Sequence, residues 1–208
     1  MKGDSNTSGG AGLCLAPALH ARTARELLGD RPLPALLRVR PVVFVLGPAE
    51  SGKSSVAARL FSAPDPRRCD AECLRLALNR AARNRKWCAE NLEAPGLWLD
   101  AVDCLHGRYG AIELLGRLLS ERARAGRRTV LCQGPADASL SLLYGKVAPE
   151  VGASVLLRFP VGRGRKRFVA DRCRARGIDP ARAAGATSLE PWSYAAVERF
   201  LDRLAPPA

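Results

Sequence analysis

The chain has 208 residues, of which 47% are hydrophobic and 25% are charged, a balance that is ordinary for a soluble globular protein. No apolar run approaches the roughly 20 residues that a membrane-spanning helix needs, which argues against an integral membrane protein. Residues 1–12, MKGDSNTSGGAG, are polar and glycine-rich and lack the apolar stretch of a secretory signal. We therefore expect a loose tail at this end and a cytoplasmic protein.

Basic residues outnumber acidic ones by 33 to 20, which gives a net charge of +13 and a pI of about 10.2. Such a balance is typical of proteins that bind nucleic acid or another polyanion. Only five of the basic residues are lysines, however, and an abundance of Arg, Ala, Gly and Pro also follows from genome composition. Charge alone leaves both interpretations open. The seven cysteines form no CxxC pair, so reduced, buried thiols are predicted rather than a metal site.

Residues 1–40 are predicted to form the tail, a short helix over Ala21–Asp30 and a proline-marked connector. From residue 41 to residue 160 the pattern alternates between strand and helix. Val42–Leu46 is continuously apolar, as expected of a strand that is covered on both faces. A helix follows this strand, and the segment SAPDPRR ends that helix. The predicted elements of this region are a helix over Lys53–Phe61, a helix over Ala71–Arg85, a strand over Leu97–Val102, a helix over Ala111–Ala125, and strands over Thr129–Cys132 and Ala153–Phe159. This alternation predicts an α/β domain with a parallel sheet flanked by helices.

The pattern changes after Pro160, because no further strand is predicted. A basic helix is expected over Arg165–Arg176, a single turn over Ala181–Ala184, and an amphipathic helix over Pro191–Leu204 with the proline in its first turn. Residues 161–208 are therefore predicted to form a small α-helical lid.

The stretch GPAESGKSS fits the pattern G-x-x-x-x-G-K-[ST] and stands between a buried strand and a helix. Backbone N–H groups of such a loop converge on phosphate oxygens, and the helix adds its positive N-terminal end. We predict that the loop binds ATP or ADP, with Lys53 reaching the β- and γ-phosphates and Ser54 holding Mg²⁺. The expected cradle comprises Gly47, Pro48, Ala49, Glu50, Ser51, Gly52, Lys53, Ser54 and Ser55.

A nucleotide site of this class takes an acidic residue from the end of a neighbouring strand. Asp100 directly follows the apolar residues Leu97–Leu99, so we expect it to hold Mg²⁺ directly or through water. Ala101 comes next, where an efficient NTPase has a second carboxylate that orients the attacking water. Asp103 lies two residues beyond Ala101, in a less suitable direction along the chain.

These segments together resemble the AAA+ module of the replication initiator DnaA and its shorter relative Hda. The similar stretches are Leu97–Asp137, Leu156–Asp179 and Ser193–Leu204, and the resemblance covers roughly residues 40–204. It implies a five-stranded P-loop NTPase sheet of order 5-1-4-3-2, followed by the helical lid. It also implies that Gln133, near the sensor I position, contacts the γ-phosphate or its water. Lys53, Asp100 and Gln133 are the catalytic residues that the resemblance supports.

The chain departs from this family where hydrolysis is concerned. The second Walker B acid falls on Ala101, the arginine finger falls near Pro149, and the sensor II arginine falls on Ala195. The sequence also stops after the lid, without the DNA-binding domain of DnaA. The expected function is therefore that of a nucleotide-binding regulator with weak or absent ATPase activity. Another AAA+ subunit or a replication or regulatory protein is the expected partner, with oligomerisation on nucleotide binding.

Two other interpretations stay open. The first is a small P-loop kinase in which the basic stretch RGRKRFVADRCRARG is a phosphate-clamping lid, although a kinase lid precedes the last strand. The second is a basic, non-specific nucleic-acid binder with a relic P-loop. In that interpretation the helix Arg75–Trp87 presents Arg80, Arg83, Arg85 and Lys86, with Trp87 free to stack on a base.

Overall fold

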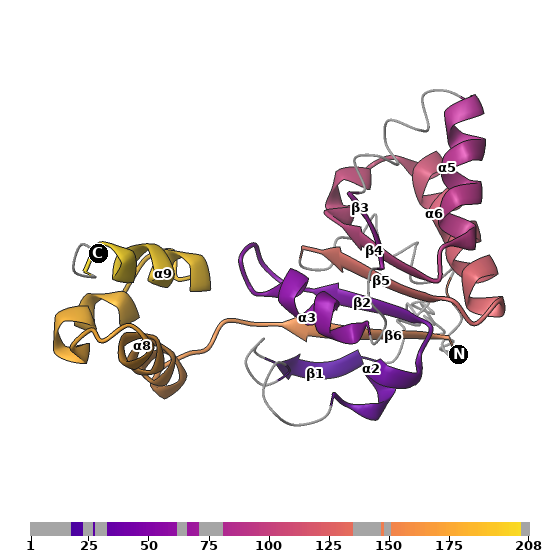
Figure 1. Cartoon of the computed structure of the whole chain (residues 1–208). Coiled ribbons are helices and arrows are strands. Elements are labelled where there is room, and N and C mark those ends of the chain that lie inside the picture. The colour runs from indigo at the N-terminus through magenta and orange to yellow at the C-terminus, as the bar shows by residue number, and fades with distance from the viewer. Residues whose placement is uncertain are drawn as a thin grey trace, which may run out of the picture.

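The computed structural model describes residues 18–22, 27, 33–61, 66–70, 81–134, 147 and 151–204. Figure 1 shows an α/β body joined to a separate group of helices at the C-terminal end. The elements, in chain order, are β1 (Ala18–Arg22), α2 (Ala35–Val39), β2 (Val42–Leu46), α3 (Lys53–Leu60), β3 (Arg67–Asp70), α5 (Ala81–Glu93), β4 (Gly96–Asp100), the 3-10 helix η1 (Val102–Leu105), α6 (Tyr109–Arg124), β5 (Arg128–Gln133), β6 (Gly152–Leu157), α8 (Arg163–Ala175), the 3-10 helix η2 (Pro180–Thr187) and α9 (Tyr194–Asp202).

The described strands form one parallel sheet in the order β1-β6-β2-β5-β4-β3. Counted from β2, the five strands from β6 to β3 have the order 5-1-4-3-2, which confirms the predicted fold class. Strand β1 adds a sixth strand at the edge beside β6, and the sequence did not predict it. Ala21 and Arg22 belong to this strand, so the predicted helix over Ala21–Asp30 is wrong at its start. Of the remainder of that segment the structure describes only Leu27, which is helical.

Helices cover both faces of the sheet, as the continuous apolar run in β2 predicted (Figure 1). All five residues of β2 are buried, and they alternate between the two faces. Val43 and Val45 pack with residues of α3 such as Val56, whereas Phe44 packs with residues of α6 such as Leu115. The two faces therefore bury separate apolar cores, and β2 lies between them with its carboxyl end leading into the phosphate loop.

Strand β3 lies within the region where the sequence predicted only an interruption. Its residues, Arg67–Asp70, pair with β4 at the edge of the sheet. Strand β4 ends at Asp100 rather than at the predicted Val102, because Ala101 adopts φ 53° and turns the chain into η1. These two differences place a charged edge strand and a sharp turn next to Asp100.

The helix predicted over Ala71–Arg85 is described from Ala81 and continues to Glu93, while residues 71–80 lie outside the described part. The nucleic-acid interpretation had Trp87 available to stack on a base, and the structure contradicts this. The Trp87 side chain is buried in the core between the sheet and helices α5 and α6. Burying a large aromatic ring there stabilises the fold and removes the ring from any nucleic-acid surface.

After Pro160 the described residues contain helices and no strand. They bury a core of their own, which includes Val169, Cys173 and Trp192, and Phe168 packs edge-on against Trp192 at 5.9 Å between ring centroids. Helix α9 begins at Tyr194 and not at Pro191, because Ser193 caps it by accepting a hydrogen bond from Ala196 N at 3.0 Å. Within the described residues, no helix is long and apolar enough to cross a membrane.

Candidate phosphate-binding site

The loop between β2 and α3 has the conformation that its glycines allow. A Cβ atom on Gly47 would lie 2.7 Å from Ser51 Oγ and 3.0 Å from the carbonyl oxygen of Leu157, so no side chain fits there. Gly52 adopts a left-handed φ of 88° and caps α3. Gly47 N also donates to the carbonyl of Gln133 at 3.2 Å, which anchors the loop to β5. The loop therefore packs directly against β5 and β6 at the carboxyl edge of the strands.

Lys53, the first residue of α3, folds back over this loop. Its Nζ donates to the carbonyl oxygens of Gly47 at 2.9 Å and Pro48 at 2.8 Å. The ammonium group is thus held at the mouth of the cradle by two neutral acceptors and by no carboxylate among the described residues. A phosphate oxygen is a stronger, charged acceptor for the same group.

Ser54 and Asp100, the two residues predicted to hold Mg²⁺, meet across the carboxyl edge of the sheet. Ser54 Oγ lies 3.4 Å from Asp100 Oδ2, while Asp100 Oδ1 accepts a hydrogen bond from Ala101 N at 3.1 Å. A hydroxyl and a carboxylate oxygen are hard donors of the kind that Mg²⁺ takes beside phosphate and water. The pair therefore fits a magnesium ion bound together with nucleotide. The described residues include no cluster of three His, Cys, Asp or Glu residues suited to a metal.

A positive charge reaches Asp100 from β3. Arg68 Nη2 lies 3.1 Å from Asp100 Oδ2, and its guanidinium stacks over the Trp98 ring with 4.3 Å between Cζ and the centroid. Arg68 was not predicted as a site residue, because the sequence RRCD of β3 lacks the apolar pattern of a buried strand.

Gln133 ends β5 and lies opposite Leu46 in the sheet register. Its side chain is fully buried, and neither Oε1 nor Nε2 has a hydrogen-bond partner among the described residues. Buried amides are almost always paired, so this amide is available to a polar ligand. Asp103 also lies at this edge, but both of its carboxylate oxygens accept from Gly134 N, at 2.7 and 2.8 Å. That contact ties Asp103 to the end of β5.

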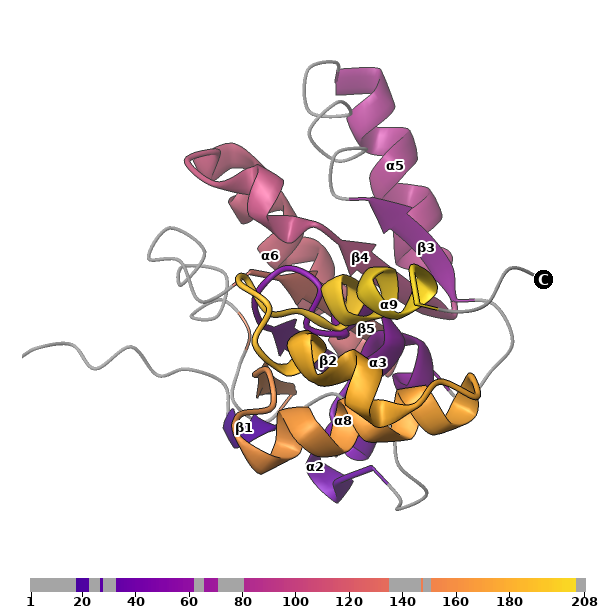
Figure 2. The ribbon, with the colours of Figure 1, turned by 90° about the vertical axis from the view of Figure 1, so that its left-hand side faces the viewer.

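The C-terminal helices contact the phosphate loop through Glu50, a loop residue with φ 58°. Ser193 Oγ donates to Glu50 Oε2, and Arg199 Nη1 lies 3.4 Å from Glu50 Oε1. The hydrogen bond from Ser193 lowers the pKa of Glu50, and the charge of Arg199 acts in the same direction against the effect of partial burial. Figure 2 shows α9 in front of this loop. Ala195 on α9 carries no charge. Arg199, one turn later on the same helix, contacts the loop at Glu50.

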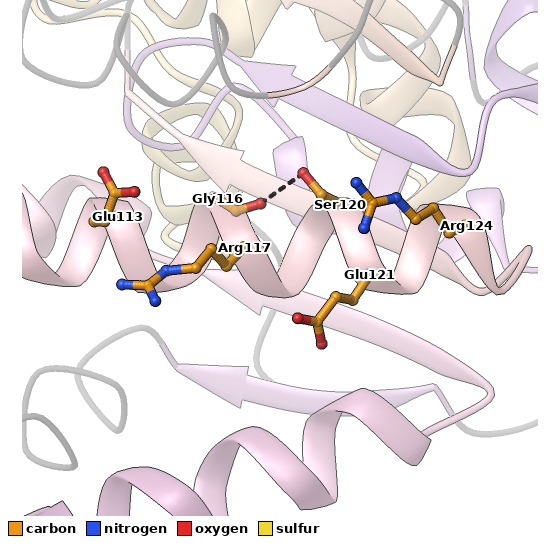
Figure 3. A pocket seen from close by; sticks show the side chains of 6 residues that line it. All are labelled: Glu113, Gly116, Arg117, Ser120, Glu121 and Arg124. Atoms are coloured by element: carbon orange, nitrogen blue, oxygen red, sulfur yellow. Dashed lines mark hydrogen bonds between the residues drawn. The ribbon is translucent and has the colours of Figure 1, made fainter.

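A separate hollow of about 410 Å³ follows one face of α6 (Figure 3). Within it, Ser120 Oγ donates to the carbonyl oxygen of Gly116 at 3.0 Å. The charged residues around it alternate in sign. The hollow shares no residue with the phosphate loop, and it is lined by Glu113, Gly116, Arg117, Ser120, Glu121 and Arg124.

Fold and loop together define the class of protein: this is an α/β P-loop NTPase fold with an all-parallel sheet. Within that class, the fold is similar to that of solved structures of the replication initiator DnaA. DnaA bound to AMPPCP and single-stranded DNA matches with a TM-score of 0.53 and 14% identity, over 70% of this chain and 48% of that one. AMPPCP-bound DnaA from Aquifex aeolicus matches with a TM-score of 0.52 and 11% identity, over 69% and 48%.

A structure described as a DNA replication initiation factor matches with a TM-score of 0.51 and 12% identity, over 69% of this chain and 48% of that chain. This chain thus spans about half the length of the structures that it matches. No protein-family model and no curated protein matches the sequence. At these identities the likeness establishes the fold.

Proposed function

We propose that this chain binds ATP or ADP with Mg²⁺ and acts as a DnaA- or Hda-like AAA+ regulatory protein in the cytoplasm. The observation that carries the proposal is the convergence of Lys53, Ser54 and Asp100 around a glycine cradle at the carboxyl edge of a parallel sheet. Such an arrangement offers backbone N–H groups and an ammonium group to phosphates, and two oxygen donors to the accompanying metal.

The roles of the individual residues follow from their positions. Residues 47–55 wrap the phosphates, and Lys53 exchanges its two carbonyl acceptors for phosphate oxygens. Ser54 and Asp100 hold the metal, which supplies charge neutralisation when it is bound. The unpaired amide of Gln133 contacts the terminal phosphate or the water beside it. Residues 41–160 form the nucleotide-binding domain and residues 161–208 form the lid.

The lid links nucleotide binding to protein interaction in this proposal. Ser193 and Arg199 contact Glu50, which lies within the phosphate loop itself, so a change in the loop is transmitted to α9. The partner is another AAA+ subunit or a replication or regulatory protein. This chain binds that partner in a nucleotide-dependent oligomer.

Replacing Lys53 with alanine is expected to weaken nucleotide binding on the order of 100-fold, because a charge-assisted contact to phosphate is lost. A fluorescent ATP analogue titrated by anisotropy measures this. Lys86→Ala is the matched control, since Lys86 is an exposed lysine on α5 that lies near Glu90. If folded Lys53→Ala binds as tightly as wild type, the site is assigned wrongly.

A second candidate function is non-specific binding of nucleic acid, favoured by the charge distribution on α8. The arginines in its second half and directly after its end are paired: Arg172 and Arg176 contact Glu198, and Arg174 contacts Asp171. In its first half, Arg163, Lys166 and Arg167 are exposed and have no ion pair in the part of the chain that the structure describes. The kinase alternative is disfavoured because this basic helix follows β6, the last strand.

If the first half of α8 contacts phosphates, Lys166→Ala combined with Arg167→Ala should weaken DNA binding and flatten its salt dependence. Each lost contact with duplex DNA reduces the slope of log affinity against log salt by about 0.9. Mobility shifts of a random duplex at several salt concentrations measure the slope. Arg117→Ala with Arg124→Ala, on the mixed-charge face of α6, removes the same charge as a control. Equal slopes in both double variants would assign the effect to net charge alone.

A further inference from the structure

Arg68 is positioned by two independent contacts at the place where the metal donors meet. Strand β3 pairs in parallel with β4, and in this register Arg68 lies opposite Trp98. The indole ring is almost fully buried and supports the guanidinium at 4.3 Å, while Nη2 reaches Asp100 at 3.1 Å. A planar guanidinium suits both contacts at once, and it stays charged at any physiological pH.

Arg68 holds the carboxylate oxygen that faces Ser54. Asp100 Oδ1 is engaged by Ala101 N, so Oδ2 is the oxygen directed toward the serine hydroxyl, 3.4 Å away. The same Oδ2 accepts from Arg68. A divalent cation between Ser54 and Asp100 therefore meets a guanidinium that already neutralises its carboxylate ligand.

The neighbouring arginine provides a comparison within the same strand. Arg67 precedes Arg68, and successive side chains of a strand point to opposite faces. Arg67 Nη2 pairs with Glu90 on α5 at 2.6 Å, away from Asp100. Both arginines are partly exposed and carry the same charge, but Arg68 is the one that contacts the phosphate-loop edge.

We propose that Arg68 is a resident cation of the nucleotide site, which competes with Mg²⁺ for Asp100 and makes nucleotide binding only weakly dependent on the metal. This inference rests on the proposed nucleotide binding. Without metal, the guanidinium screens Asp100, whose bare negative charge would repel the phosphates. With metal, the guanidinium must leave Oδ2 or remain close to a second positive charge.

The inference fixes the sign of two effects of Arg68→Ala. In EDTA the variant binds nucleotide more weakly than wild type, because Asp100 then faces the phosphates without a counter-charge. In Mg²⁺ the variant binds as tightly as wild type or more tightly, because the metal has no competitor. The ratio of affinities with and without Mg²⁺ therefore rises by roughly tenfold, given the strength of one charge pair near a protein surface.

The experiment measures the affinity of a fluorescent ATP analogue in Mg²⁺ and in EDTA for wild type, Arg68→Ala, Arg68→Gln and Arg67→Ala. Thermal melts verify that each variant is folded, and the glutamine variant keeps side-chain bulk over Trp98 if alanine disturbs the strand. A raised ratio in both Arg68 variants and an unchanged ratio in Arg67→Ala supports the proposal.

An unchanged ratio in folded Arg68 variants that still bind nucleotide overturns the role of Arg68 and leaves nucleotide binding intact. An equal rise in Arg67→Ala also overturns it, because the effect would then belong to net charge. If wild type binds no nucleotide under either condition, the proposed function fails and this inference fails with it.

Discussion

Replacing Arg122 with leucine is expected to destabilise the protein by about 3–5 kcal/mol, which is a large share of the roughly 5–15 kcal/mol that a domain has in total. The side chain of Arg122 is fully buried near the end of α6. Its guanidinium donates to Thr129 Oγ1 at 2.8 Å and to the carbonyl oxygens of Ala94 and Arg128, each at 2.7 Å. It thereby joins α6, β5 and the segment between α5 and β4.

The charge of Arg122 is retained although burial opposes it. Burial, with a contribution from nearby Arg127, lowers the pKa of Arg122 to about 10, which is still well above neutral pH. Carbonyl dipoles hold the cation in place of a carboxylate. Leucine would leave these acceptors buried and unpaired, and each such group costs about 1–3 kcal/mol.

Urea unfolding followed by circular dichroism measures the change in the free energy of unfolding. Arg124→Leu, two residues further along the same helix and exposed, is the matched control and should change this free energy by less than about 0.5 kcal/mol. Similar unfolding curves for Arg122→Leu and the control would mean that the buried hydrogen bonds of Arg122 contribute no net stability.

The predictable parts of the fold are the helices and strands that bury apolar residues on one or both of their faces. Val42–Leu46 is apolar throughout because the sheet is covered on both sides, and this pattern is visible in the sequence. Strand β3, with the sequence RRCD, and strand β1, with the sequence ALHAR, lie at the two edges of the sheet and lack such a pattern. Edge strands are specified by the neighbour with which they pair, and a single sequence does not reveal that neighbour.

The same reasoning separates the predictable and unpredictable parts of the site. The meeting of Ser54 with Asp100 follows from chain order, because the carboxyl ends of parallel strands share one edge of the sheet. The contacts of Arg68 and Glu50 depend on an unrecognised edge strand and on the packing of α9 against the loop. The nucleic-acid interpretation grouped Trp87 with the neighbouring arginines of the helix, although the tryptophan itself faces the core.

Isolated protein is expected to turn over ATP far more slowly than the typical enzyme value of about 10 per second. Hydrolysis needs a group that orients the attacking water and a positive charge that neutralises the transition state. Ala101 stands where the water-orienting carboxylate is expected, and Asp103 is held by Gly134 N. Among the residues that the structure describes, Gln133 is a further polar group at this edge, and an amide is no general base.

Two arginines lie near the phosphate loop, but neither is free to neutralise charge in the transition state. Arg68 is paired with Asp100, and Arg199 is paired with Glu50. No arginine occurs in the sequence between Arg128 and Arg158, so the segment in which the DnaA-like arginine finger is expected has none. Loss of such a finger costs roughly 10³–10⁵ in rate in related NTPases. If the proposed AAA+ partner supplies this charge, addition of that partner should raise the rate.

A phosphate-release assay on purified protein, with Lys53→Ala as the background control, measures this turnover. Wild type should barely exceed the control when alone, because binding is present while the water-orienting and charge-neutralising groups are missing. Turnover of about one per second or faster that Lys53→Ala abolishes would place the protein within the ordinary range of enzymes. In that case Gln133, Asp103 or one of the paired arginines must rearrange on nucleotide binding, and the loop would consume nucleotide rather than hold it.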